Sequence, residues 1–88
     1  MQIAICDDDP DIRTLLAGKI RHLYPHARIY FYESGEALSS IEQPPDILLL
    51  DIQMTGVSGM EAARRLRQKQ WPTILIFVTA LEEYVFQA

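Results

Sequence analysis

Two short apolar segments of the chain each end in aspartate, and together these acids could bind a metal ion. Asp7–Asp9 come directly after residues 3–6, and Asp51 comes directly after residues 47–50. Neighbouring strands of a sheet lie about 4.8 Å apart, so side chains at their ends can share one site. If these segments are adjacent parallel strands, their acids meet at one edge.

One of these acids has a structural task of its own. Asp9 precedes Pro10, and this pair is typical of a helix start in which the carboxylate caps the helix. Three carboxylates remain for chemistry, namely Asp7, Asp8 and Asp51. Like charges so close raise one another's pKa unless a cation is present.

The chemistry of these ligands favours a hard cation. Carboxylate oxygens without histidine or cysteine favour Mg²⁺ that keeps several of its waters. A Mg²⁺ ion that bridges carboxylates and a phosphoryl oxygen is the usual arrangement for phosphoryl transfer. The alternative is that Asp7–Asp9 and Asp11 form a solvated helix start, and that Asp51 is an unrelated loop acid.

The rest of the chain alternates between segments with strand and helix patterns. Four short segments are apolar and rich in β-branched or aromatic residues, which predicts strands at 3–6, 27–32, 47–50 and 74–78. Apolar residues at helical spacing predict a first helix through Ile12, Leu15, Leu16, Ile20 and Leu23, a third through Met60, Ala63 and Leu66, and the start of a fourth at Leu81, Tyr84, Val85 and Ala88. Ser34 is expected to cap a short second helix, and Ser58 with Glu61 has the spacing of a capping box.

This β-α-β-α-β-α-β-α order predicts an α/β fold with a parallel sheet and right-handed crossovers. The length suits the doubly wound, flavodoxin-like sheet with strand order 2-1-3-4-5. Only four strands are found, so residues 1–88 are expected to be the four-strand portion of one domain. Strand 5 and helix 5 are expected to be lacking, and no second domain is expected in this chain. Strand 4 would then be an apolar open edge that invites pairing or strand exchange between two copies.

Length and composition exclude several classes of protein. The 88 residues form one small domain, and 49% hydrophobic residues suffice for a packed core. A net charge of -4 disfavours direct binding of nucleic acid. The single cysteine excludes a disulfide framework and a CxxC metal site. The apolar runs are too short to span a membrane and the start does not resemble a signal peptide, so a cytoplasmic protein is expected.

Several motifs in the chain, in the same order, resemble the receiver domains of bacterial response regulators. The matching segments are ICDDDP at 5–10, LLLDIQM at 48–54, GME at 59–61 and FVTA at 77–80. Two further segments, FYESGE at 31–36 and EYVFQA at 83–88, look most like the receivers that precede a LytTR-type DNA-binding domain.

The resemblance implies a role for each residue of the site. Asp51 would accept a phosphoryl group from a phosphohistidine on a sensor histidine kinase. Asp8 and Asp51 would ligate Mg²⁺ directly, Asp7 would act through bound water, and the backbone carbonyl of Gln53 would complete the protein ligands. Thr79 would be the hydroxyl that turns toward the phosphoryl group and starts the conformational switch.

The resemblance also implies a signalling role. The domain would assist its own phosphorylation and dephosphorylation without being a turnover enzyme. Its output would be transcription regulation through a DNA-binding domain absent from this chain. Two positions depart from the family pattern: Thr55 stands where a proline is usual, and the lysine that ends strand 5 has no counterpart, because the last lysine is Lys69.

Two other functions fit parts of the sequence. Asp7–Asp9 contain an Asp-x-Asp after the first strand, as in phosphatases of the haloacid-dehalogenase type, but this assignment leaves Asp51 without a role. A non-signalling interaction module that takes its missing strand from a partner chain is the other alternative.

Overall fold

The computed structural model describes residues 1–54 and 56–78. Within them, four strands alternate with two α-helices and one short 3-10 helix. In chain order the elements are β1 (Gln2–Cys6), α1 (Pro10–Leu23), β2 (Arg28–Tyr32), η1 (Glu36–Ser40), β3 (Ile47–Asp51), α2 (Gly59–Gln68) and β4 (Ile74–Val78). The expected second helix is therefore a 3-10 helix. The expected fourth helix and Thr79 lie outside the described residues.

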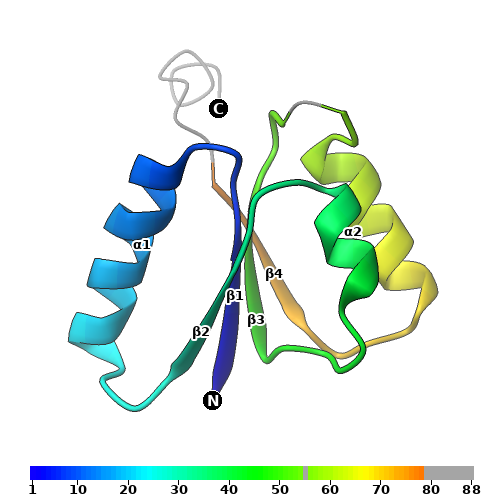
Figure 1. Ribbon diagram of the computed structural model, residues 1–88. Helices are drawn as coiled ribbons and strands as arrows, with labels where there is room; N and C mark the ends of the chain where they lie inside the picture. Colours follow the sequence, from blue (N-terminus) through cyan, green and yellow to red (C-terminus); the bar gives the residue numbers. More distant parts are fainter. Residues whose placement is uncertain (55, 79–88) are drawn as a thin grey trace, which may run out of the picture.

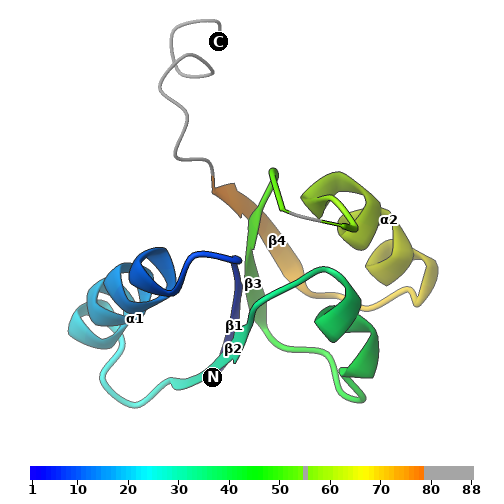
Figure 2. The same ribbon diagram turned by 45° about the horizontal axis from the view of Figure 1, so that its top comes forward.

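The four strands form one parallel sheet in the order β2-β1-β3-β4. This confirms the flavodoxin-like order predicted for the first four strands. Figure 1 shows α1 on one face of the sheet and α2 on the other, with the green turn of η1 beside α2. The view in Figure 2, from nearer the carboxyl ends of the strands, shows the same two layers on either side of the sheet.

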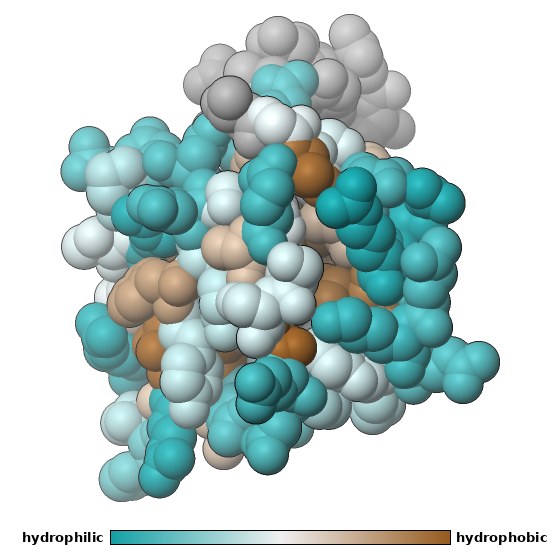
Figure 3. Space-filling model, turned by 45° about the vertical axis from the view of Figure 1, so that its right-hand side comes forward, coloured by the Kyte–Doolittle hydropathy of each residue, from teal (hydrophilic) through white to brown (hydrophobic). Residues whose placement is uncertain are grey.

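The alternation of side chains along each strand divides the core between these two faces. On the face of η1 and α2, the cluster from β1 and β3 is Ala4, Cys6, Leu48 and Leu50, and it packs against Leu38, Ile41, Ala62, Ala63 and Leu66. Ile3 and Ile5 are equally buried but lie outside that cluster, so they face α1 together with the buried Ala17. Figure 3 brings the right-hand side of Figure 1 forward and shows a mainly hydrophilic surface, with hydrophobic areas between the polar ones.

Strand β4 is exposed although its sequence is apolar on both faces. A strand that is apolar on both faces predicts cover on both sides, yet Ile74, Ile76 and Phe77 are all exposed, with Ile74 at 59%. Within the described residues β4 pairs with β3 alone. This agrees with the expected open apolar edge at strand 4.

The helix starts follow the predicted capping chemistry. The Asp9 carboxylate accepts a hydrogen bond from the backbone N–H of Asp11 at 2.9 Å, and Pro10 is the first residue of α1. The Ser58 hydroxyl accepts one from the N–H of Glu61 at 3.2 Å at the start of α2. These caps fix where α1 leaves β1 and where α2 leaves the loop after β3, the two connections that carry the acids.

None of the helices in residues 1–54 and 56–78 combines the length and apolar character that a membrane crossing needs.

Candidate acidic site at the carboxyl ends of β1 and β3

The fold brings three of the predicted ligands together. Asp7, Asp8 and Asp51 each offer a carboxylate oxygen, and these oxygens lie within 4.8 Å of one another. The reason is the strand register: β1 and β3 are direct neighbours, with Cys6 opposite Leu50. The next residue of each strand is an aspartate, so the two acidic ends coincide at one edge of the sheet.

The turn after β1 is held by hydrogen bonds of both the side chain and the backbone of Asp7. Its carboxylate accepts from the backbone N–H of Asp9 at 2.9 Å. Its backbone carbonyl accepts from the guanidinium of Arg13 at 2.7 Å, and its own N–H donates to the carbonyl of Tyr32 at 3.0 Å. With only 5% of its surface exposed, Asp7 is the innermost of the three acids. Arg13 was not singled out in the sequence, because its contact is with backbone and leaves no motif.

Burial and mutual repulsion make the charged form of Asp7 and Asp51 less favourable. Burial, and then the charges of Asp51, Asp8 and Asp9, raise the pKa of Asp7 above its ordinary value, although the N–H of Asp9 opposes this. Burial, followed by the charge of Asp8, also raises the pKa of Asp51. A cation among these carboxylates would offset both effects.

The donor set fits Mg²⁺. Three carboxylates from two adjacent strand ends offer hard oxygen ligands, and Mg²⁺ is usually bound by a few such ligands while it keeps several of its waters. Asp8 is exposed and Asp51 is half-buried, so the cluster is reachable from solvent. The arrangement can therefore hold a divalent cation beside Asp51.

The loop after β3 lies close against the end of that strand. The Asp51 carboxylate accepts from the N–H of Gln53 at 3.1 Å, which folds the loop back over the acid. The N–H of Gly59 donates to the carbonyl of Ile52 at 3.0 Å. A side chain at Gly59 would place its Cβ 2.8 Å from the carbonyl carbon of Asp51, so this contact requires glycine.

A buried thiol lies beneath the site. The Sγ of Cys6 donates to the carbonyl of Ser34 at 3.3 Å and contacts the sulfur of Met54 at 3.6 Å. Burial, and then the charge of Asp7, raise the pKa of this thiol to about 12. Cys6 is therefore a protonated core residue, as its place in an apolar strand predicted.

Gln53 lies close to Asp51 through its backbone N–H, and the expected role of its carbonyl as a metal ligand stays a prediction. Thr79 lies outside the described residues, so its expected role stays a prediction. Asp7, Asp8 and Asp51 converge as predicted.

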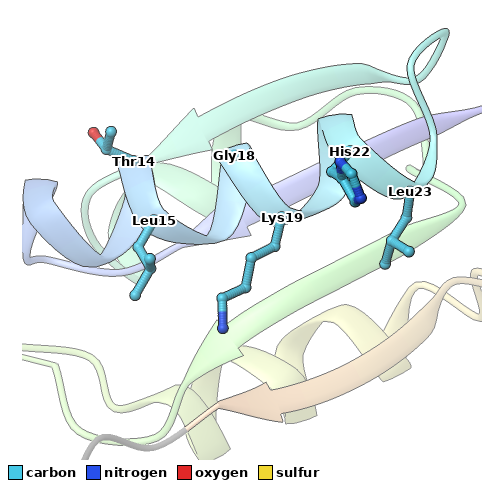
Figure 4. Close-up of a pocket in the computed structure, with 6 residues that line it drawn as sticks. All are labelled: Thr14, Leu15, Gly18, Lys19, His22 and Leu23. Carbon is cyan, nitrogen blue, oxygen red and sulfur yellow. The ribbon is translucent and has the colours of Figure 1, made fainter.

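A separate hollow lies along α1, and its lining residues are Thr14, Leu15, Gly18, Lys19, His22 and Leu23. Figure 4 shows Leu15, Lys19 and Leu23 extending from the same side of this helix. None of the three clustered acids lines it.

Comparison with known proteins identifies the family. The model of the response regulator receiver domain matches residues 3–88. The chain belongs to the response regulator receiver family. It is thus a receiver domain of the kind found in two-component response regulators, which confirms the resemblance found in the sequence.

The individual relatives agree with this assignment. An uncharacterized response regulatory protein of Vibrio cholerae is 39% identical over 87 residues, which cover 96% of this chain and 33% of the relative. The sensory transduction protein LytT of Bacillus subtilis is 29% identical over 90 residues, covering 100% of this chain and 37% of LytT. The chain thus spans about a third of the length of the curated relatives it matches.

Solved structures show the same fold. The response regulator TrrA of Thermotoga maritima, in complex with Mg²⁺ and BeF, matches with a TM-score of 0.82 and 33% identity over 94% of this chain and 72% of TrrA. TrrA in complex with the histidine kinase ThkA matches with a TM-score of 0.76 and 36% identity, over 90% of this chain and 68% of TrrA.

Proposed function

We propose that Asp51 is the phosphoacceptor of this receiver domain. The observation that carries the proposal is the convergence of Asp7, Asp8 and Asp51 at the joined ends of β1 and β3. A carboxylate oxygen of Asp51 attacks the phosphorus of the donor, a P–O bond forms, and the P–N bond of a phosphohistidine breaks. The released imidazole takes up a proton. Asp51 at the end of β3 is half-buried, which leaves it open to a donor from solvent.

The other acids hold the metal ion for this transfer. Asp8 and Asp51 ligate Mg²⁺ directly, Asp7 acts through bound water, and the backbone carbonyl of Gln53 supplies the last protein ligand. When bound, Mg²⁺ neutralises charge on the phosphoryl oxygens and on the clustered carboxylates. Asp7 is suited to an indirect part, because it is the most buried of the three acids, with 5% of its surface exposed. Thr79 is proposed as the switch hydroxyl that answers the new phosphoryl group.

The partner and output are proposed by analogy with the relatives. The donor is a sensor histidine kinase, which the complex of TrrA with ThkA supports. The output is transcription regulation through a DNA-binding domain, which the likeness to the DNA-binding transcriptional activator EvgA of Escherichia coli, 31% identical over 91 residues, supports. The domain itself does not bind nucleic acid, acts in the cytoplasm, and is not a turnover enzyme.

Intact-mass spectrometry tests the acceptor. The protein is incubated with acetyl phosphate and Mg²⁺, beside Asp51→Asn and a matched control, Asp11→Asn, which removes an exposed acid from the first turn of α1. We expect one phosphate adduct in the protein and in the control, and none in Asp51→Asn or without Mg²⁺. An adduct would also show that the missing family lysine is dispensable for charging. An adduct that persists in Asp51→Asn would refute the assignment.

The same experiment separates the phosphatase alternative. A haloacid-dehalogenase-type enzyme would use the Asp-x-Asp of Asp7–Asp9 and would release inorganic phosphate continuously. A receiver takes up a single phosphoryl group. Steady turnover of a phosphoester that survives Asp51→Asn would therefore favour the phosphatase.

A second candidate, pairing of two copies, is favoured by the exposed residues Ile74, Ile76 and Phe77 of β4. Exposed apolar edge strands tend to pair with another chain. Sedimentation over a range of concentrations tests it. A well-folded monomer at every concentration would exclude strand exchange.

A further inference from the structure

The loop between β3 and α2, residues 52–58, carries Gln53 and so forms one wall of the acidic site. Its two ends are joined, because the N–H of Gly59 donates to the carbonyl of Ile52 at 3.0 Å. Its first turn is fixed by the bond from the Gln53 N–H to Asp51. What holds the far side of the loop decides how firmly Gln53 is placed.

That far side is held by η1, an element distant in sequence. The Glu36 carboxylate accepts a hydrogen bond from the backbone N–H of Val57 at 2.8 Å, across 21 residues. Gly56 has a φ of 81°, a left-handed conformation that favours glycine. A Cβ there would lie 2.5 Å from the Glu36 carboxylate oxygen, so the carboxylate lies directly against the loop backbone.

The residue before Glu36 packs against the same loop. A Cβ at Gly35 would lie 2.8 Å from the carbonyl oxygen of Val57 and 2.9 Å from its Cβ. Two glycines, one from each segment, thus permit a close approach that brings Glu36 within reach of Val57. This contact has no local sequence pattern, because it depends on the tertiary placement of η1 beside the loop.

A second tie joins the same two segments nearer the sheet. Cys6 contacts the carbonyl of Ser34, just before η1, and the sulfur of Met54, within the loop. The loop is therefore held to the β2–η1 connection at Met54 and again at Val57. Gln53 lies between Asp51 and Met54 in the chain. The contact of Glu36 with Val57 therefore restrains the end of the loop that is farther from Asp51 in the sequence.

We propose that Glu36 is a positioning residue of the metal site, which holds the loop after β3 through Val57 and thereby sets the affinity for Mg²⁺. This rests on the proposed function, in which the Gln53 carbonyl is a ligand. Hydrogen bonds to a charged acceptor are about twice as strong as neutral ones. A carboxylate at position 36 therefore restrains the loop more firmly than water or a neutral side chain would.

Three substitutions at position 36 separate the length of the side chain from its charge. Glu36→Ala removes both, Glu36→Asp keeps the charge but withdraws the carboxylate by one methylene, and Glu36→Gln keeps an oxygen within reach of the Val57 N–H. The matched control is Glu42→Ala, which removes an exposed acid just beyond η1. All are titrated with MgCl₂ by isothermal titration calorimetry, without any phosphoryl donor, and melted in EDTA.

We expect Glu36→Ala and Glu36→Asp to bind Mg²⁺ on the order of 10-fold more weakly, the size typical of outer-shell supports. Glu36→Gln should stay within about 3-fold of the unmodified protein, because the hydrogen bond persists in weaker form. Glu42→Ala should be unchanged. The residue is exposed, so melting in EDTA should shift little; a merely structural role would instead lower the melting temperature and leave the affinity alone.

The proposal is overturned if Glu36→Ala binds Mg²⁺ as tightly as the unmodified protein, or if Glu36→Asp does so, since charge without reach would then suffice. It is also overturned if Glu36→Gln is as weak as Glu36→Ala. Failure of the proposed function gives a different result. In that case the unmodified protein itself binds no Mg²⁺, or binds Mg²⁺ and takes up no phosphoryl group.

Discussion

The two faces of the sheet are packed to different degrees. On the face of η1 and α2, the side chains of Leu48 and Leu50 have no exposed surface, and the loop after β3 approaches η1 so closely that only glycine fits at the contacts. On the face of α1, Ile3 and Ile5 of β1 are equally buried, but Leu15 of α1 is 54% exposed and Ile76 of the edge strand β4 is 44% exposed. The acids lie where the two faces meet, at the ends of β1 and β3.

This difference bears on how the site works. We call the face of η1 and α2 the closed face and that of α1 the open face. The loop beside Asp51 is held from the closed face, through Gly59, Met54 and Val57. The exposed apolar residues of α1 and β4 make no such contribution to the geometry of the acids. Substitutions in the contacts that hold this loop should therefore disturb both stability and the site, whereas substitutions of the exposed residues Leu15 and Ile76 should disturb neither strongly.

The largest expected effect is at Gly59. In Gly59→Ala the new Cβ meets the backbone of Asp51 and Ile52, which cannot yield without moving α2 away from β3. Overpacking against fixed atoms typically costs 1–3 kcal/mol and occasionally more, so we expect a loss of about 3 kcal/mol in the free energy of unfolding. Urea denaturation measures it, and Mg²⁺ affinity should fall as well.

Gly18 provides the matched control on the open face. A Cβ at Gly18, within α1, meets nothing within 4 Å. Because glycine inside a helix is less favourable than alanine by about 0.5–1 kcal/mol, Gly18→Ala should stabilise the protein by roughly that amount. If Gly59→Ala proved as stable as the unmodified protein, this would contradict the close contact of Gly59 with the backbone of Asp51 and Ile52.

The second expected effect compares two apolar residues. Leu48→Ala, at 0% exposure, should lower the free energy of unfolding by about 3 kcal/mol, within the 2–5 kcal/mol typical of buried leucine. Ile76→Ala, at 44% exposure, should cost less than about 1 kcal/mol, because most of the removed surface is already in contact with water. Equal losses in urea denaturation would contradict the difference in packing between the central strand β3 and the edge strand β4.

The sequence was sufficient for those features that depend on order and periodicity. The sheet order of the first four strands and the convergence of Asp7, Asp8 and Asp51 follow from strands that end in acids and pair as neighbours. The caps by Asp9 and Ser58 were predictable because both bonds are local in the chain.

Features that depend on tertiary distance were not predictable. The short second helix is 3-10, and Glu36 at its start bonds a residue 21 positions away. Arg13 holds a backbone carbonyl that any residue at position 7 would offer. Such contacts leave no periodic signal, so only the placement of η1 and α1 around the strand ends reveals them.

The smallest expected effect is that of the Asp51 charge on the melting temperature. Burial raises the pKa of Asp51, so the folded protein favours the neutral form. A carboxyl group whose pKa is higher in the folded than in the unfolded protein stabilises the fold at a pH below its unfolded pKa of about 3.9. This stabilisation is lost as the pH rises through the pKa of the folded protein. Asp51→Asn, which stays neutral, should therefore melt at a higher temperature at pH 7 in EDTA.

The same comparison at low pH checks the cause of that gain. At pH 3 Asp51 is largely protonated, so the melting temperatures of Asp51→Asn and the unmodified protein should converge. Asp11→Asn, which removes an exposed acid of α1, should show no comparable gain at pH 7. Saturating Mg²⁺ should reverse the order, because it stabilises the protein that keeps all three carboxylates by binding the folded state. A lower melting temperature for Asp51→Asn at pH 7 in EDTA would mean that the bond from Gln53 outweighs the cost of the charge.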